Sequence, residues 1–280
     1  LQKTAVKKAL ERAGLEPGEV DNIFAGDLLN QCIGSSFGLR EFGIPFIGLY
    51  GACSTMALST GLAAMFVDSG AAKHTVAVTS SHFCSAERQY RFPLNYGSQR
   101  TPTAQWTVTG SGALALGCRK GDIYINSVTF GEIEDYGIKD ANNMGAAMAP
   151  AAAGTLLNFF ADTGTTPKDY DIIFTGDLGY VGTNLLYELL ERENVDIRCR
   201  HSDCGLIIFD RENQDVHAGG SGCGCSASVL CSYVMHRFEA GDFKNILFMS
   251  TGALMSPTSS FQGESIPGIA HLLNIKKDEK

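Results

Sequence analysis

The sequence contains an internal repeat, and this feature restricts the possible folds more than any other. The pentapeptide FAGDL (Phe24–Leu28) returns as FTGDL (Phe174–Leu178), and the pattern of Asp68–Ser81 returns at Glu239–Gly252. These matches keep their order and a similar offset. They indicate two diverged copies of one structural unit within the 280 residues.

Short apolar runs alternate with helical patterns in each copy. In the first copy, the predicted strands cover residues 22–26, 44–50 and 74–81. Alternation of this kind is typical of a parallel, layered α/β architecture. We therefore predict an α/β fold from two βαβ-rich halves, residues 1–120 and 121–280, with a fresh strand opening the second half near Gly121.

Cys53 lies at a glycine turn that leads into an apolar helical pattern, Tyr50–Gly70. The offset of the repeat pairs this turn with Gly220–Ser228, GSGCGCSAS, which again leads into a helical pattern. A helix N-terminus lowers the pKa of a thiol placed there and also suits a bound carboxylate. The residues alone leave open whether Cys53 is a nucleophile, part of a binding pocket, or a small buried side chain.

Composition excludes several classes of function. A formal net charge of -8 without clustered Lys and Arg argues against a nucleic-acid binder. Nine cysteines and no signal peptide favour reduced thiols, and the close pair Cys223 and Cys225 lacks zinc-site spacing, so we expect no metal site. No apolar run approaches the length of a membrane span, so we expect no transmembrane segment.

The repeat, with a cysteine opening the third helix of its first copy, resembles the thiolase superfamily, which includes the ketoacyl synthases. This resemblance implies a layered α-β-α-β-α fold. More narrowly, several motifs resemble the stage V sporulation AD family of spore-forming bacteria. These motifs are FAGDLLNQ, IPFIGLYGACST, TSSHFCSAERQYRFPLNYGSQ, TVTGSGA, MGAAMAPAAAGT, HSDCGLIIF, AGGSGCGCSA and ESIPGIAH.

The family resemblance implies a protein peripheral to the inner membrane of the forespore and spore, beside other stage V sporulation membrane proteins. It implies binding of dipicolinic acid, alone or as its calcium chelate, during uptake and germination release, with no cofactor. It also implies a homodimer that pairs through the strand before the cysteine helix, residues 44–50. Because family members carry a segment before the helix that opens this chain, we expect the first copy to lack its leading strand.

The resemblance also bears on catalysis. Condensing enzymes of the superfamily support their cysteine with two polar side chains from the second copy, usually histidines, or histidine and asparagine. Here the corresponding positions hold Asp177 and the turn with Ser221, Gly222 and Cys223. A carboxylate does not donate to an oxyanion unless it is protonated, and it opposes a nearby thiolate.

We therefore expect no enzyme activity. The alternative is a thiolase or ketoacyl-synthase type acyltransferase that uses Cys53 as nucleophile and takes proton transfer from His82 or His201. A third possibility is an interaction scaffold whose pocket is vestigial.

The expected ligand is flat and carries two carboxylates, so its site needs hydrogen-bond donors, a cation and an aromatic or apolar wall. The candidate ligand-binding residues are Cys53, Ser54, Asp27, His82, Asp177, Ser221, Gly222 and Cys223. The candidate cations are Arg88, Arg91 and Arg100 in the irregular segment 82–107. Asp27 and Asp177 could ligate calcium in a chelate or cap the turn after each strand, and both readings stay open.

Overall fold

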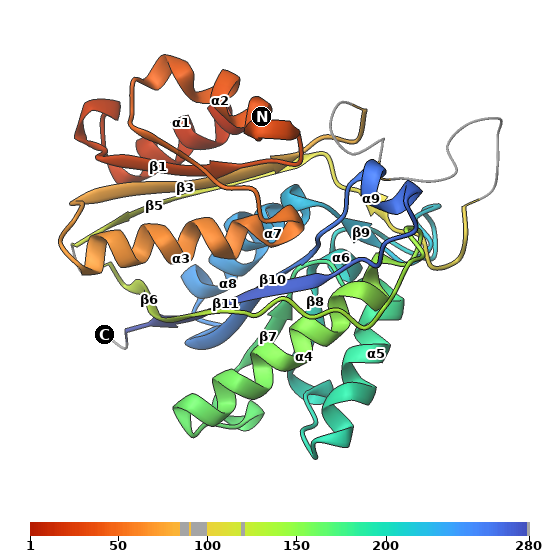
Figure 1. Cartoon of the computed structure of the whole chain (residues 1–280). Helices are drawn as coiled ribbons and strands as arrows, with labels where there is room; N and C mark the ends of the chain where they lie inside the picture. Colours follow the sequence, from red (N-terminus) through yellow and green to blue (C-terminus); the bar gives the residue numbers. More distant parts are fainter. Residues whose placement is uncertain (85–89, 91–99, 119–120, 279–280) are drawn as a thin grey trace.

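The computed structural model describes residues 1–84, 90, 100–118 and 121–278. Two β-sheets are separated by a central layer of helices and covered by helices on their outer faces (Figure 1). The outer helices are α1 (Gln2–Ala13) and α2 (Ile33–Leu39) on the first sheet, and α4 (Met144–Thr163) and α5 (Gly179–Arg192) on the second. The central helices are α3 (Thr55–Asp68), α7 (Cys223–Val229) and α8 (Met235–Ala240). This confirms the predicted α-β-α-β-α layering.

The first sheet has the strand order β2-β1-β3-β5. Its strands are β1 (Asn22–Gly26), β2 (Phe46–Gly48), β3 (His74–Ser81) and β5 (Gly110–Gly117). Strand β1 runs parallel to β2 and β3, while β5 runs antiparallel to β3 with Gly117 opposite His74. The predicted strand at 44–50 is thus shorter than expected and forms one edge of this sheet.

The second sheet has the order β6-β11-β10-β7-β8. Its strands are β6 (Ile123–Phe130), β7 (Ile172–Thr175), β8 (His201–Asp203), β10 (Asn245–Ala253) and β11 (Gly268–Lys277). The series β8-β7-β10-β11 repeats β2-β1-β3-β5 in order and direction, which is the structural form of the sequence repeat. Strand β6 pairs with β11 and has no counterpart in the first sheet among the described residues.

Small residues explain how the central helices fit between the sheets. A Cβ atom on Gly224 in α7 would lie 2.5 Å from the carbonyl oxygen of Gly110, so only glycine allows this approach to β5. A Cβ on Gly61 in α3 would lie 2.7 Å from the side chain of Val128 in β6. After α7 the chain continues through a π-helical turn, Leu230–Val234, into α8.

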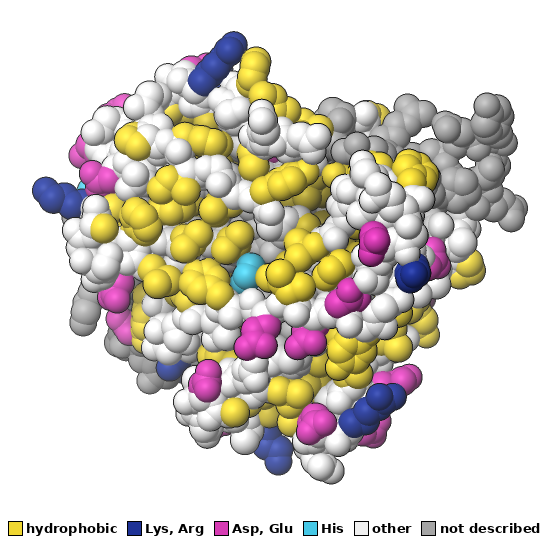
Figure 2. Space-filling model, in the orientation of Figure 1, with side chains coloured by type: hydrophobic (Ala, Val, Ile, Leu, Met, Phe, Trp, Pro, Cys, Tyr) yellow, Lys and Arg dark blue, Asp and Glu magenta, His cyan; other side chains and the backbone are white. Residues whose placement is uncertain are grey.

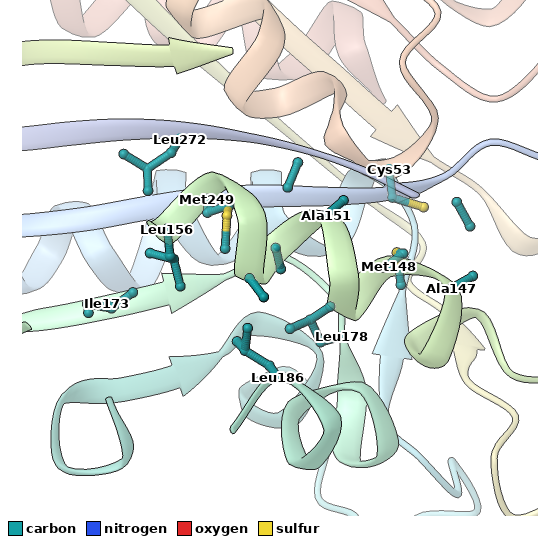
Figure 3. Packing of buried hydrophobic residues seen from close by; sticks show 14 of the residues in the cluster. Cys53, Ala147, Met148, Ala151, Leu156, Ile173, Leu178, Leu186, Met249 and Leu272 are labelled. Carbon is teal, nitrogen blue, oxygen red and sulfur yellow. The ribbon is translucent and has the colours of Figure 1, made fainter. Parts of the chain in front are cut away.

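Helix α4 corrects the expectation that no apolar run has the length of a membrane span. Its 20 residues are long and apolar enough by length and composition alone. Of the most apolar window in this helix, 78% is buried inside the protein, where it packs on β10, β11 and α5. Met148 and Leu156 are fully buried there (Figure 3). Phe159 is almost fully buried as well, so the hydrophobic residues of α4 form part of the core.

The remaining short elements lie around the ends of the strands. They are β4 (Trp106–Thr107), α6 (Cys204–Ile207), β9 (Gly220–Ser221) and α9 (Pro257–Phe261). Strands β4 and β9 form a two-stranded parallel pair that joins the segment before β5 to the turn before α7. This pair ties the two copies of the repeat together close to Cys53.

Candidate functional site

A cavity of about 290 Å³ lies over Cys53, where residues from both copies meet. It opens near the carboxyl ends of β1 and β10, the edge at which parallel α/β sheets bind ligands. The described lining residues are Leu28, Tyr50, Ala52, Cys53, Tyr90, Met144, Ala253, Leu254, Met255, Ser256 and Ser259. None of these carries a charged side chain, and most are aliphatic or aromatic.

Cys53 reaches the cavity from a strained turn. Ala52 has a φ of 51°, in the left-handed region that non-glycine residues seldom adopt, and a 3-10 turn Ala52–Ser54 precedes α3. The helix therefore begins at Thr55, two residues later than expected. Ser54 is buried and its hydroxyl donates to the carbonyl of Gly51, so this predicted site residue serves the turn and does not line the cavity.

Asp177 lies directly beside Cys53. Its Oδ2 accepts hydrogen bonds from Ser221 Oγ at 2.7 Å and Gly222 N at 2.9 Å, and its Oδ1 accepts one from Thr251 Oγ1 at 2.9 Å. The Cys53 thiol also hydrogen-bonds to this carboxyl group. Burial raises the pKa of Asp177, and these hydrogen bonds oppose the shift.

In the second glycine turn, the backbone N–H groups of Gly222 and Gly224 donate to other groups of the protein. Gly222 N binds Asp177, and Gly224 N donates to Ser81 Oγ at 2.7 Å. Cys223 Sγ contacts the carbonyl oxygen of Ala52 at 3.1 Å. The structure thus brings Cys53, Asp177 and this turn together, with Cys53 in the lining of the cavity and with Asp177 and the turn behind the thiol, outside the described lining.

Asp27 takes the capping role that the sequence left open. Its side chain is 3% exposed, and its carboxylate accepts from Leu29 N at 2.9 Å and from both N and Oγ of Ser35 at 2.7 and 2.5 Å. Like Asp177, it is held by protein donors and does not line the cavity.

Within the described ranges, no three His, Cys, Asp or Glu side chains are grouped as a metal site would require.

The histidines lie away from the cavity. His82 is exposed and outside the described lining. His201 lies between Thr175 Oγ1 and Tyr187 OH, each at 2.9 Å, and burial lowers its pKa to about 4. His271 accepts a hydrogen bond from Gly131 N, and burial lowers its pKa to about 4 as well.

The candidate cations are not brought into the cavity. Arg88 and Arg91 lie outside the described residues. Arg100 is described, pairs with Asp215 at 2.5 Å and lines a smaller recess that shares two walls with the cavity.

Sequence reasoning missed most of the cavity walls. Tyr50 lies in the loop after β2, Met144 is the first residue of α4, and residues 253–256 comprise the end of β10 and the loop after it. The internal repeat could have identified residues 253–256. They follow β10 in the second copy as Ser81 ends β3 in the first copy, and the carboxyl ends of these strands form the edge at which such sheets bind ligands.

Two comparisons with known sequences agree. The pattern of the stage V sporulation protein AD family matches residues 1–276. The stage V sporulation protein AD of Bacillus subtilis (strain 168) is 45% identical over 271 residues, which cover 97% of this chain and 80% of that protein.

Comparison with solved structures shows the fold. The 3-oxoacyl-[acyl-carrier-protein] synthase III of Aquifex aeolicus matches 98% of this chain and 83% of its own, with a TM-score of 0.63 and 14% identity. Cerulenin-bound OleA of Xanthomonas campestris matches 97% of this chain and 79% of its own, with a TM-score of 0.65 and 11% identity. At these identities the likeness extends to the thiolase-like fold and no further.

Proposed function

The chain belongs to the stage V sporulation protein AD family and has a thiolase-like fold, and we propose that it is a non-catalytic binding protein for dipicolinic acid or its calcium chelate. In this proposal it acts in dipicolinate uptake into the forespore and in release during germination, at the periphery of the inner spore membrane. The observation that carries the proposal is the cavity over Cys53, which is small, has aromatic walls and is backed by a carboxyl group.

The cavity suits a small flat ligand. Its volume of about 290 Å³ lies at the lower end of the range for small-molecule sites. Tyr50 and Tyr90 offer aromatic faces, and Ser256 and Ser259 contribute polar atoms to the lining. Because the described walls carry no charge, we expect the neutral calcium chelate to bind more tightly than the free dianion.

The surroundings of Cys53 support binding without turnover. Acyl transfer needs a thiolate and a group that moves protons near it. Here the group hydrogen-bonded to the thiol is the buried carboxyl group of Asp177. Among the described lining residues there is no histidine.

Calorimetry with dipicolinate, in the presence and absence of calcium, tests the proposal. Saturable binding by the wild-type protein and by Cys53→Ala is expected, whereas Ala253→Phe fills the cavity and should abolish binding. No heat at millimolar ligand would count against the proposal. Incubation with acyl-CoA followed by intact-protein mass spectrometry tests the acyltransferase alternative, which predicts an adduct on Cys53.

The same proposal includes a homodimer. Strand β2 is an unpaired edge of the first sheet among the described residues, and its Phe46 is 40% exposed. Figure 2 shows hydrophobic side chains gathered across this face of the molecule, and Met65 of α3 and Phe130 of β6 are also exposed. We propose that two copies pair through β2, and that other surfaces meet the other stage V sporulation membrane proteins.

A further inference from the structure

We propose that a polar recess beside the cavity, between Arg100 and Gln105, seats one water molecule that donates a hydrogen bond to a carboxylate of the bound ligand. This inference rests on the proposed function, because it assigns how the same ligand is recognised. It names a recognition element that lies outside the cavity over Cys53.

The recess adjoins the cavity and has the size of a single water. Its volume is about 10 Å³, close to the smallest space that holds one water. Its lining residues are Tyr90, Arg100, Ala104, Gln105, Ala141, Asn142 and Met144. Since Tyr90 and Met144 also line the cavity, the two spaces share two walls.

Two residues that line the recess each have a buried polar atom without a hydrogen-bond partner among the described residues. Gln105 is 4% exposed, and its Nε2 donates to the carbonyl oxygens of Asp177 at 2.6 Å and Gly220 at 3.0 Å. These bonds fix the orientation of the amide, so its unpartnered Oε1 is an acceptor. The Arg100 Nη1 atom is also buried without a partner and is a donor.

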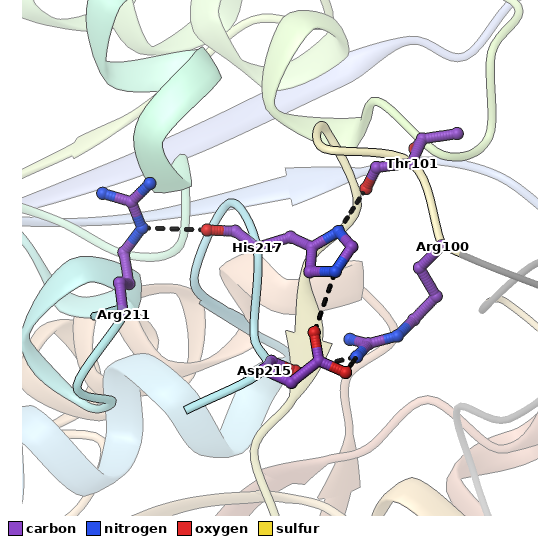
Figure 4. Close-up of polar contacts among 5 residues, drawn as sticks. All are labelled: Arg100, Thr101, Arg211, Asp215 and His217. Carbon is purple, nitrogen blue, oxygen red and sulfur yellow. Dashed lines mark hydrogen bonds and ion pairs between the residues drawn. The ribbon is translucent and has the colours of Figure 1, made fainter. Parts of the chain in front are cut away.

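Hydrogen bonds to Asp215 hold the Arg100 guanidinium on the side that faces the protein surface (Figure 4). Its Nη2 donates to the Asp215 carboxylate at 2.5 Å and to the Asp215 carbonyl at 2.8 Å, and the guanidinium stacks over Trp106 at 4.3 Å. His217 Nε2 contacts the same carboxylate at 2.9 Å, and His217 Nδ1 donates to the Thr101 carbonyl at 2.7 Å. The side chain is therefore held in one position, with Nη1 left for the recess.

A water molecule satisfies both buried atoms at once. It accepts from Arg100 Nη1, donates to Gln105 Oε1 and keeps one proton for a third partner. A carboxylate oxygen placed directly in the recess would meet Gln105 Oε1, a second acceptor, so the water fits better. The water then links the ligand carboxylate in the cavity to the guanidinium of Arg100 by hydrogen bonds. The described walls of the cavity itself carry no such cation.

Arg100→Met tests this assignment, with Asp215→Asn as its matched control. Both variants break the surface ion pair, but only Arg100→Met removes the donor in the recess. In calorimetry with dipicolinate, we expect Arg100→Met to bind about tenfold more weakly than wild type, as expected for loss of a charge-assisted hydrogen bond. Asp215→Asn keeps the Arg100 Nη2 hydrogen bond to the backbone carbonyl of residue 215 and the stacking on Trp106, so it should bind like wild type. Equal affinities for wild type and Arg100→Met would overturn the inference.

A second measurement separates this inference from the proposed function. If the wild-type protein gives no heat with dipicolinate, the proposed function fails. A crystal structure of the ligand-free protein, at a resolution that shows ordered waters, still tests the recess. A water within hydrogen-bonding distance of Arg100 Nη1 and Gln105 Oε1 is expected, and a dry recess would overturn the inference.

Discussion

Gly145 and Gly182 bring α4 and α5 into backbone contact next to the cavity wall formed by Met144. A Cβ atom on Gly145 would lie 2.5 Å from the carbonyl oxygen of Leu178 and 2.8 Å from the Gly182 nitrogen. Both neighbours are backbone atoms, so no side chain can turn away to make room. Gly145→Ala should therefore push the two helices apart and shift Met144.

The net effect can be worked out from two opposing terms. Overpacking costs about 1–3 kcal/mol, and the higher helix propensity of alanine returns up to about 1 kcal/mol. With the full propensity gain returned, we expect Gly145→Ala to lower the free energy of unfolding by up to about 2 kcal/mol and to weaken dipicolinate binding through the displaced wall.

Urea unfolding of Gly145→Ala and Gly154→Ala, two substitutions in the same helix, measures the effect. At Gly154 the nearest atom to an added Cβ is Glu134 Oε1, at an ordinary 3.5 Å. Gly154→Ala should therefore gain up to about 1 kcal/mol from helix propensity. If the two variants have the same stability, the contact between Gly145 and Gly182 does not constrain the helices as we argue.

Two further predictions concern the buried carboxyl group of β8 and the edge strand β2. Burial raises the folded-state pKa of Asp203 from 3.8 to about 7, so the stability it contributes is complete below pH 3.8 and is lost as pH rises towards 7. Relative to Asp203→Asn, the wild-type protein should lose unfolding free energy over this range, and parallel pH profiles would contradict the argument. Phe46→Asp should convert a dimer to a monomer in light scattering, and a dimeric variant would refute pairing through β2.

The sequence predicted the strands that are buried on both faces. Residues 74–81 form β3 with the predicted bounds, because HTVAVTSS is a nearly continuous apolar and β-branched run bounded by turns. The repeat predicted that β10 would take the equivalent place in the second sheet. Local composition carries this information because such strands must be apolar along their whole length.

The cavity could not be predicted in the same way. Its walls depend on how Tyr50, Met144 and residues 253–256 converge from distant parts of the chain. The role of Asp27 was also open, since a carboxylate after a strand can bind a ligand or cap a turn, and only the position of Ser35 decides for the cap. The apolar run of α4 was not predicted from the sequence, and its burial follows from packing between the second sheet and α5.

Alkylation of the cysteines, followed by peptide mass spectrometry with and without dipicolinate, tests the central claim most directly. Cys53 lines the cavity, while Cys84, Cys118 and Cys199 are exposed and serve as internal controls. We predict that dipicolinate slows alkylation of Cys53 in a saturable way and leaves the three exposed cysteines unchanged. An unchanged rate at Cys53 under saturating ligand would contradict the assignment of this cavity as the binding site.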